Sequence, residues 1–167
     1  MKQTLASNLL ENPVGGKLFL LNKVFTQMIP FNSPHKVKIL FLSRNKVKTF
    51  IPYRRSNFNH LNGIHACATS ALGEFAAGLL VLKNFNLMNY RIILKELNTE
   101  YSYQGRTDLF GEITIEDNFF KNTKEELEKN TRTEIEVKTK VLDVNNHLIA
   151  TVRSLWQLKD WKKVKTK

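Results

Sequence analysis

A nearly uncharged segment between His65 and Lys83 constrains the fold of this chain more than any other part. It reads ACATSALGEFAAGLLVL, and Glu74 is its only carboxylate. As a helix, this segment is apolar on every side, which is typical of a helix buried in a core. A carboxylate there is costly unless it is paired, neutral or used chemically. The fold must therefore cover this helix almost completely and give Glu74 a special environment.

Size and charge leave several classes of partner open. A chain of 167 residues with 42% hydrophobic residues is sufficient for one domain with a proper core. The net charge of +11 is compatible with nucleic acid, an anionic membrane surface or a phosphorylated small molecule. No helix-turn-helix, zinc finger or RNA-recognition signature accompanies the basic residues. We therefore favour a solvated basic surface and tail, and no nucleic-acid partner.

Cysteine usage and the ends of the sequence bear on location. The lone Cys67 cannot form an internal disulfide, and no Cys/His cluster has zinc spacing. We therefore expect a cytoplasmic protein without a metal. Glu11 and the breaker at residues 13–16 interrupt anything that resembles a signal peptide. Glu74 and the small polar residues near it argue against a membrane span for the apolar segment.

Hydrophobic periodicity predicts two flanking helices and about six strands around the buried helix at residues 65–83. An amphipathic helix is expected from Lys17 to Met28, where Pro30 stops it, and a short surface helix within residues 117–130. The expected strands cover residues 36–42, 46–53, 90–101, 107–116, 133–143 and 147–159. In the first, Val37, Ile39 and Phe41 alternate with Lys36, Lys38 and Leu40, and in the fifth one face carries Ile135, Val137, Thr139 and Val141. Turn residues at 43–45 and 102–106 suggest that the first two and the middle two strands form hairpins.

Together these elements predict an α+β domain spanning residues 1–167. An antiparallel sheet of about six strands would curl around the long central apolar helix, and residues 1–30 would form an N-terminal helical segment. Residues 160–167 would form a basic tail. Such a sheet leaves one side of the helix and one sheet edge uncovered, which argues for a partner chain.

The loop at residues 59–65 leads directly into the start of the buried helix. It is polar and turn-forming, and a helix start presents free backbone N–H groups that can hold developing negative charge. An acid, such a helix end and an apolar cavity together suggest acyl-transfer chemistry.

The same region carries a family resemblance. Asn59-x5-His65-Ala66 followed by Glu74 resembles the Asn-x5-His-Gly-Gly-x6-Asp/Glu pattern of the PaaI-like acyl-CoA thioesterases, which have the hotdog fold. The segment Leu72-Gly73-Glu74-Phe75-Ala76-Ala77-Gly78 is similar to an uncharacterised, DUF4442-like branch of that superfamily. The order of strands resembles the fold from about residue 30 to 159.

The resemblance implies roles for particular residues. Glu74 would be the general base or the nucleophile, and the backbone N–H of Ala66 would polarise the thioester carbonyl. His65 would position the loop or the thioester, and Asn59 takes the place of the loop asparagine. The implied substrate is an acyl-CoA or a related thioester, so coenzyme A enters as part of the substrate and no other cofactor is expected. Further candidate contacts for the substrate are Asn62, Gly63, Cys67, Arg54 and Arg55.

Helix geometry predicts that two subunits share the site. Glu74 follows His65 by nine residues, which at about 1.5 Å per residue places it roughly 13 Å further along the axis. One thioester cannot reach both places. A two-fold dimer with antiparallel central helices would bring Glu74 of one subunit to the helix start of the other, which agrees with the resemblance. We expect a homodimer, or a tetramer built from it.

Simpler interpretations of these residues stay open. Glu74 could accept hydrogen bonds from a partner loop and only fix the dimer. His65 could be a helix-capping neighbour and Cys67 a small helix filler. Arg54 and Arg55 could meet the phosphates of coenzyme A, or simply be an exposed strand end.

Differences from the family pattern motivate a second function. Ala66 and Cys67 replace the Gly-Gly pair, and Gly78 stands where some relatives have a hydroxyl. A hotdog protein that binds acyl-CoA or lipid without hydrolysis is therefore the alternative. A hydratase or dehydratase ranks lower, because the spacing fits thioesterases better, and nucleic-acid binding ranks last.

Overall fold

The computed structural model describes residues 9–10 and 13–164. Parts of the expected N-terminal segment (residues 1–8 and 11–12) and of the basic tail (residues 165–167) lie outside the described residues.

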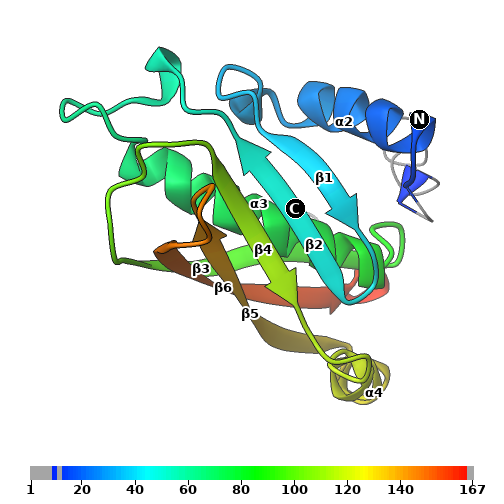
Figure 1. Ribbon diagram of the computed structural model, residues 1–167. Coiled ribbons are helices and arrows are strands. Elements are labelled where there is room, and N and C mark those ends of the chain that lie inside the picture. The colour runs from blue at the N-terminus through cyan, green and yellow to red at the C-terminus, as the bar shows by residue number, and fades with distance from the viewer. Residues whose placement is uncertain (1–8, 11–12, 165–167) are drawn as a thin grey trace.

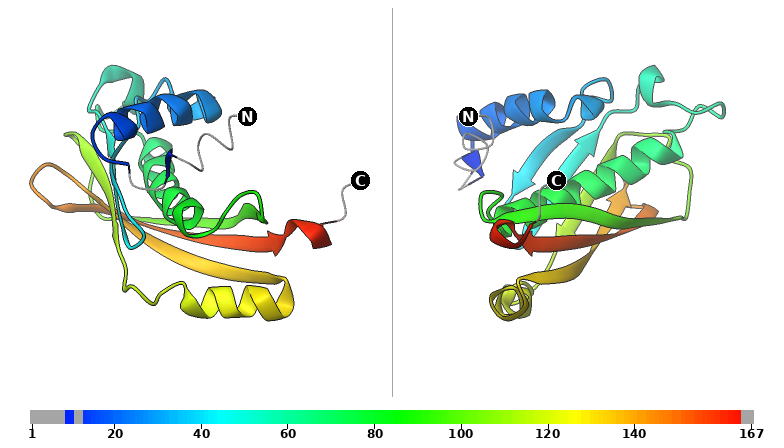
Figure 2. Two further views of the ribbon diagram at one scale, coloured as in Figure 1. Left: turned by 90° about the vertical axis from the view of Figure 1, so that its right-hand side faces the viewer. Right: turned by 180° about the vertical axis from the view of Figure 1, so that it is seen from behind.

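The predicted sheet around one central helix is confirmed. Six antiparallel strands lie in the order β1-β2-β4-β5-β6-β3 and curl around helix α3 (Ala66–Asn84), as Figures 1 and 2 show. The strands are β1 (Lys38–Leu42), β2 (Lys46–Ile51), β3 (Tyr90–Tyr101), β4 (Leu109–Thr114), β5 (Arg132–Leu142) and β6 (Leu148–Asp160).

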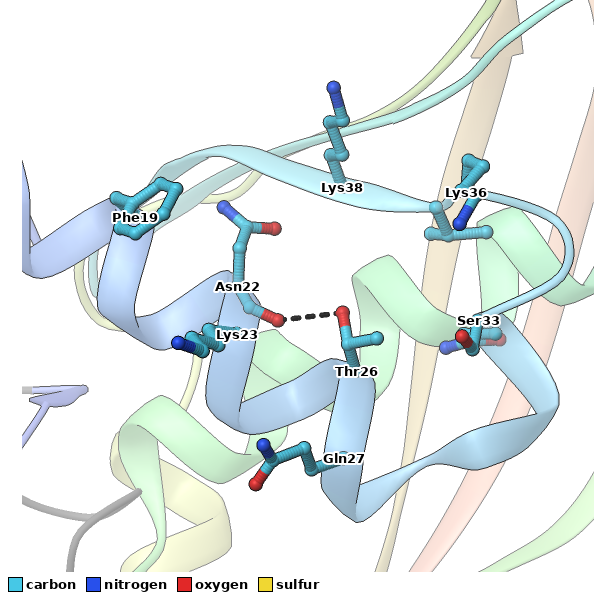
Figure 3. A pocket seen from close by; sticks show the side chains of 10 residues that line it. Phe19, Asn22, Lys23, Thr26, Gln27, Ser33, Lys36 and Lys38 are labelled. Carbon is cyan, nitrogen blue, oxygen red and sulfur yellow. Dashed lines mark hydrogen bonds between the residues drawn. The ribbon is translucent and has the colours of Figure 1, made fainter.

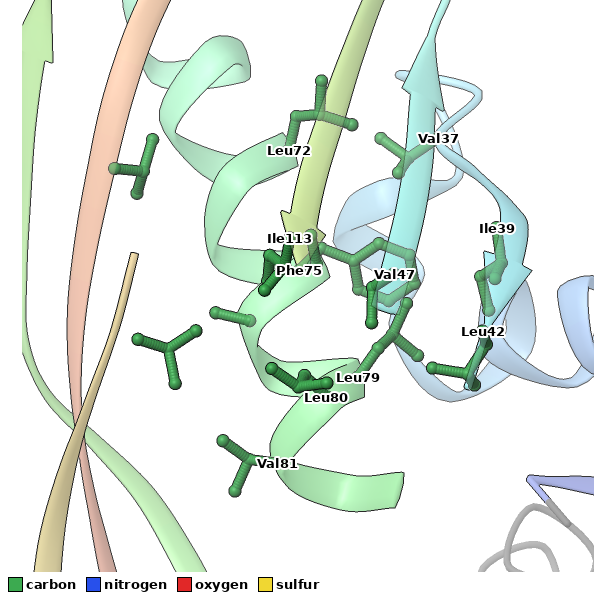
Figure 4. Packing of buried hydrophobic residues seen from close by; sticks show 14 of the residues in the cluster. Val37, Ile39, Leu42, Val47, Leu72, Phe75, Leu79, Leu80, Val81 and Ile113 are labelled. Atoms are coloured by element: carbon green, nitrogen blue, oxygen red, sulfur yellow. The ribbon is translucent and has the colours of Figure 1, made fainter. Parts of the chain in front are cut away.

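Helix α3 is the core helix of the molecule, although its length and apolar composition would also suit a membrane span. Leu72, Leu79 and Leu80 are almost completely excluded from solvent. They pack beside Val47 of β2 and Ile113 of β4, as Figure 4 shows. Burial of this apolar surface is the main source of stability for the fold.

Small residues and threonines hold the sheet against the middle of α3. A Cβ atom at Gly73 would lie 2.5 Å from Val152 on β6, so only glycine permits this close packing. The buried hydroxyl of Thr139 on β5 donates to the Gly73 carbonyl at 2.9 Å, and that of Thr49 on β2 lies 3.5 Å from the Leu72 carbonyl. These contacts fix the helical turn that directly precedes Glu74.

The N-terminal helix is confirmed as α2 (Gly16–Met28), followed by the short 3-10 turn η1 (Pro30–Asn32). Its buried side chains include Leu21, Val24 and Phe25. The Phe25 ring meets the Phe75 ring of α3 edge-on, with centroids 5.9 Å apart. Helix α2 lies beside β1 at one end of the sheet.

The surface helix is confirmed as α4 (Lys121–Asn130), which packs against β5 on the face of the sheet opposite α3 (Figure 2). Two further 3-10 turns, η2 (Arg55–Asn57) and η3 (Trp161–Lys163), follow β2 and β6.

The predicted hairpin of β3 and β4 is wrong. Strand β3 pairs with β6 at the end of the sheet, whereas β4 pairs with β2 and β5. The connecting loop instead crosses the N-terminal end of α3, where the Gly105 carbonyl accepts a hydrogen bond from the Ile64 N–H at 2.7 Å. A short glycine-containing loop is typical of a hairpin, but here tertiary contacts with α3 decide its path.

The predicted alternation in the first strand is also wrong at one position. Val37 and Ile39 face the core as expected, but Phe41 is 45% exposed and Leu42 is buried in its place. The register of β1 against β2 shifts between Ile39 and Phe41. Such a bulge moves the following side chains to the opposite face.

Candidate functional site

The loop before α3 is organised by its own polar side chains. The Asn59 carboxamide oxygen accepts the backbone N–H groups of Leu61 at 2.9 Å and Gly63 at 3.1 Å. Asn62 has a left-handed φ of 57°, a conformation that asparagine tolerates better than most residues. Asn59 therefore shapes the loop through its side-chain oxygen.

Neighbouring elements hold this loop in place. The Tyr53 hydroxyl donates to the Asn62 carbonyl at 2.5 Å, and the His65 N–H donates to the Asn57 carbonyl at 2.7 Å. A Cβ atom at Gly63 would lie 2.5 Å from the Gln104 side chain, so glycine lets this loop approach the β3–β4 loop without displacing that side chain. The start of α3 is consequently fixed from three sides.

His65 is the N-cap residue of α3. Its Nδ1 accepts the backbone N–H of Cys67 at 3.1 Å, and its carbonyl accepts the N–H of Thr69 at 3.0 Å. Within the described part of the chain, the Ala66 N–H donates to no acceptor. The cap thus satisfies one helix-end donor and leaves the adjacent Ala66 donor available, as an oxyanion site requires.

Glu74 is half-buried, and desolvation raises the pKa of its carboxyl. It forms no hydrogen bond or ion pair with the described residues. A Cβ atom at Gly78 would lie 3.9 Å from the Glu74 Oε1 atom and 3.2 Å from the Trp156 ring. The carboxylate therefore lies beside Gly78, one turn before it on α3, on the side of the helix that faces the Trp156 ring of β6. These surroundings favour a proton acceptor of raised basicity.

Helical spacing shows which side of α3 carries this acid. Ser70, Glu74 and Gly78 are four residues apart and lie along one stripe of the helix. Ser70 contacts β3, and Gly78 contacts Trp156 on β6. Glu74 therefore lies toward the β6–β3 end of the sheet, where the sheet stops.

A cluster of three hydroxyl groups, Ser70, Thr99 and Tyr101, lies beside the helix start. The Ser70 and Tyr101 hydroxyl oxygens are 2.5 Å apart, and Thr99 donates to Ser70 at 3.0 Å. The Tyr101 hydroxyl is also 3.0 Å from the Ala66 carbonyl. This cluster was not predicted from the sequence. Its one signal was the position of Ser70, four residues before Glu74.

A cavity of about 420 Å³ opens next to this cluster. Asn59, Ala66, Thr69 and Tyr101 line it, whereas Glu74 does not. One chain therefore brings the loop, the helix start and a tyrosine together, but it leaves the acid outside that cavity. This separation agrees with the spacing argument for a site built from two subunits.

The other predicted contact residues occupy the periphery. Cys67 is exposed in the first turn of α3. Arg54 and Arg55 are exposed at η2, just beyond the end of β2. No group of three or more His, Cys, Asp or Glu side chains in the described ranges could hold a metal ion.

Solved structures show the same architecture. Protein PA5026 of Pseudomonas aeruginosa, named as a probable thioesterase, matches with a TM-score of 0.78 at 20% identity, covering 85% of this chain and 95% of that one. Thioesterase HI1161 of Haemophilus influenzae matches with 0.70 at 11% identity, covering 89% and 94%. Thioesterase PA1618 of Pseudomonas aeruginosa matches with 0.69 at 10% identity, covering 90% and 97%.

These similarities establish the fold as the hotdog fold. At such identities they show the fold alone, since one fold hosts many activities. No curated protein matches the sequence. A family model does match, over residues 17–158, and the chain therefore belongs to the family described as domain of unknown function, DUF4442.

Proposed function

We propose that this protein is a thioester hydrolase that acts on acyl-CoA, with an active site shared between two subunits. The observation that carries the proposal is Glu74, a half-buried carboxylate of raised pKa without a partner among the described residues. The available Ala66 N–H at a rigid helix start supplies the second requirement. The fold shared with proteins named as thioesterases supports the same activity.

The chemistry follows from these two groups. Glu74 of one subunit takes a proton from water as the water oxygen attacks the thioester carbonyl carbon. The Ala66 N–H of the other subunit donates to the resulting oxyanion. When the tetrahedral intermediate collapses, the C–S bond breaks, and the proton passes to the sulfur of the leaving coenzyme A. The products are a carboxylic acid and free coenzyme A.

Direct attack by the Glu74 carboxylate is the other route. It would form a mixed anhydride with release of coenzyme A, and water would then hydrolyse the anhydride. A single turnover in ¹⁸O-labelled water separates the two routes, because only the anhydride route exchanges an oxygen of Glu74.

The proposed dimer forms through the β6–β3 end of the sheet. Glu74 faces that end, and β3 has no strand on its outer side within the described structure. Two subunits joined there with antiparallel α3 helices would bring each acid toward the partner's helix start. Arg54 and Arg55 are then candidates for the phosphates of coenzyme A. We place the protein in the cytoplasm, where acyl-CoA substrates are available.

The role of His65 in this proposal is positional. Its Nδ1 accepts the Cys67 N–H, so the ring orients the first turn of α3 and with it the Ala66 N–H. Asn59 acts similarly, through the loop that its side-chain oxygen holds together.

The test is hydrolysis of a panel of acyl-CoA substrates, measured as the release of free thiol. We expect Glu74→Gln to lower kcat/KM by about 100-fold or more, the scale of a lost general base. Glu128→Gln, on the exposed side of α4, is the matched control and should retain full activity. Equal rates for the wild type and Glu74→Gln on every substrate would refute the hydrolase mechanism.

One observation favours the alternative function of acyl-CoA or lipid binding without turnover. The Trp156 ring occupies the space beside Gly78 where some relatives carry a hydroxyl. Stoichiometric binding of acyl-CoA by the wild type, with no release of thiol over the whole panel, would establish the binding function in place of the hydrolase.

A further inference from the structure

The positive charge of this chain is concentrated in one part of the sequence. From residue 12 to residue 73 there are nine of the 26 Lys and Arg residues and none of the 15 Asp and Glu residues. Nine of the eleven net positive charges therefore belong to this stretch. It forms α2, η1, β1, β2 and the loop before α3.

These elements meet at a hollow between α2 and β1. It has a volume of about 460 Å³, and Figure 3 shows Phe19, Lys23, Lys36 and Lys38 around it. Among the described residues that line this hollow, none is acidic. A surface with several cations and no carboxylate among its lining residues attracts anions.

The same end of the molecule exposes large hydrophobic side chains. Phe19 of α2 is 74% exposed, although α2 already buries Leu21, Val24 and Phe25 on its inner side. The same stretch of chain also exposes Val14, Leu20, Phe31, Leu40 and Phe41. Exposed apolar residues in such number are a feature of interaction sites.

A neighbouring β-strand is not the natural occupant of this end. The Asn22 carboxamide already accepts the Ile39 N–H at 2.7 Å and donates to the Ile39 carbonyl at 2.9 Å. The outer edge of β1 is therefore occupied at its centre. The exposed apolar side chains of α2, Phe19 and Leu20, lie outside this contact.

We propose that the α2–β1 face, defined by Phe19, Leu20, Lys23, Lys36 and Lys38, binds the surface of an anionic lipid bilayer. Exposed aromatic and aliphatic residues beside lysines enter the interface of a membrane, with their apolar groups among the acyl chains. The lysines then approach the phosphates of anionic head groups.

A lipid surface explains these residues better than nucleic acid does. Lysines serve both ligands, but the aliphatic Val14 and Leu20 gain nothing from a phosphodiester backbone. A bilayer accommodates them together with Phe19. This interaction requires neither Glu74 nor a thioester, so it stands or falls independently of the proposed hydrolase.

The experiment is co-sedimentation of the full chain with vesicles. Vesicles of phosphatidylcholine and phosphatidylglycerol in equal parts should bind the protein, and pure phosphatidylcholine vesicles should not. Binding should weaken as salt is raised.

Two variants separate the contributions of charge and apolar contact. The triple variant Lys23→Glu, Lys36→Glu, Lys38→Glu and the double variant Phe19→Ser, Leu20→Ser should each weaken vesicle binding by about tenfold or more. The matched control is Lys121→Glu, Lys124→Glu, Lys129→Glu on α4, which makes the same change in net charge and should bind vesicles nearly as well as the wild type. All these side chains are exposed, and a thermal melt of each variant verifies the fold.

Several outcomes overturn the proposal. One is the absence of binding to anionic vesicles, and another is an equal loss in the α4 control, which would indicate attraction without a defined face. Unchanged binding by the Phe19→Ser, Leu20→Ser variant would also overturn it. Tight binding of an oligonucleotide that only the α2–β1 lysine variant removes, without vesicle binding, would assign this face to nucleic acid.

Discussion

The two edge strands of the sheet differ in whether their outer hydrogen-bonding edge is occupied. Strand β1 has five residues, and the Asn22 side chain from α2 occupies its outer edge. Strand β3 has twelve residues and no strand beside its outer edge in the described structure. Ile93 and Leu97 of β3 are each 43% exposed, and Tyr101 is 49% exposed.

The sheet therefore has a closed edge at β1, where a side chain occupies the outer hydrogen-bonding groups, and an open edge at β3. A long, partly apolar edge strand is a site for pairing with another chain, and proteins usually block such edges. Here a side chain from α2 blocks β1, whereas no described side chain forms a hydrogen bond along the outer edge of β3. We therefore infer that a partner chain pairs with the edge of β3 and not with the edge of β1.

The largest expected effect comes from placing charge on the open edge. Ile93→Lys with Leu97→Lys would bring like charges together across a two-fold interface and should convert the dimer to a monomer. Acyl-CoA hydrolysis should fall by about 100-fold although Glu74 is retained, because the proposed site needs two subunits. Light scattering with size-exclusion chromatography gives the mass.

The same double change on the other edge is the control. Leu40→Lys with Phe41→Lys alters two exposed residues of β1 and should leave mass and activity unchanged. If this variant dissociates and the β3 variant does not, the assignment of the two edges is reversed.

A smaller effect is expected from opening the closed edge. Asn22→Leu leaves the N–H and C=O of Ile39 without partners and should lower the free energy of unfolding by about 2–3 kcal/mol. Urea denaturation measures it. Asn98→Leu on β3 is the counterpart, since the Asn98 side chain makes no hydrogen bond with the described residues, and it should change stability by less than about 0.5 kcal/mol. A similar loss of stability for both variants would mean that the hydrogen bonds between Asn22 and Ile39 contribute no stability of their own.

The smallest effect concerns the pH dependence of stability. The folded chain raises the pKa of Glu74 by desolvation, so it favours the protonated carboxyl. The contribution of Glu74 is therefore fully favourable below its ordinary pKa and is lost as pH rises through the folded-state pKa. Glu74→Gln, which stays neutral, should gain stability relative to the wild type over that range, and the two should agree at more acidic pH.

Denaturant titrations at several pH values measure this difference. In the background of the β3 lysine variant the gain should shrink, because a monomer exposes Glu74 more to water. An undiminished gain there would show that the open edge does not cover Glu74.

The sequence was sufficient to predict the elements that local patterns define. The apolar segment after His65 predicted α3, and the alternation of Ile135, Val137, Thr139 and Val141 predicted the buried face of β5. The polar residues 59–65 predicted a loop that leads into α3, and the apolar segment predicted a buried acid at Glu74, which the structure leaves half-buried. Capping of the helix was only the simpler of two interpretations of His65, and the structure shows His65 as the N-cap. Their roles in hydrolysis remain predictions.

Features that depend on long-range contacts could not be predicted. The bulge in β1 and the position of β3 beside β6 arise when distant segments meet in the sheet. The hydroxyl cluster joins Ser70 to residues of β3, and nothing in the local sequence relates them. The same holds for Asn22, whose contact with Ile39 spans seventeen positions.

The Asn22 contact also bears on how large an assembly this chain can form. A subunit with two free strand edges can add copies without limit and grow into a fibre. A subunit with one free edge stops when that edge is filled, so edge pairing ends at two copies. By occupying the outer edge of β1, the single carboxamide of Asn22 would limit the proposed assembly through β3 to a closed pair.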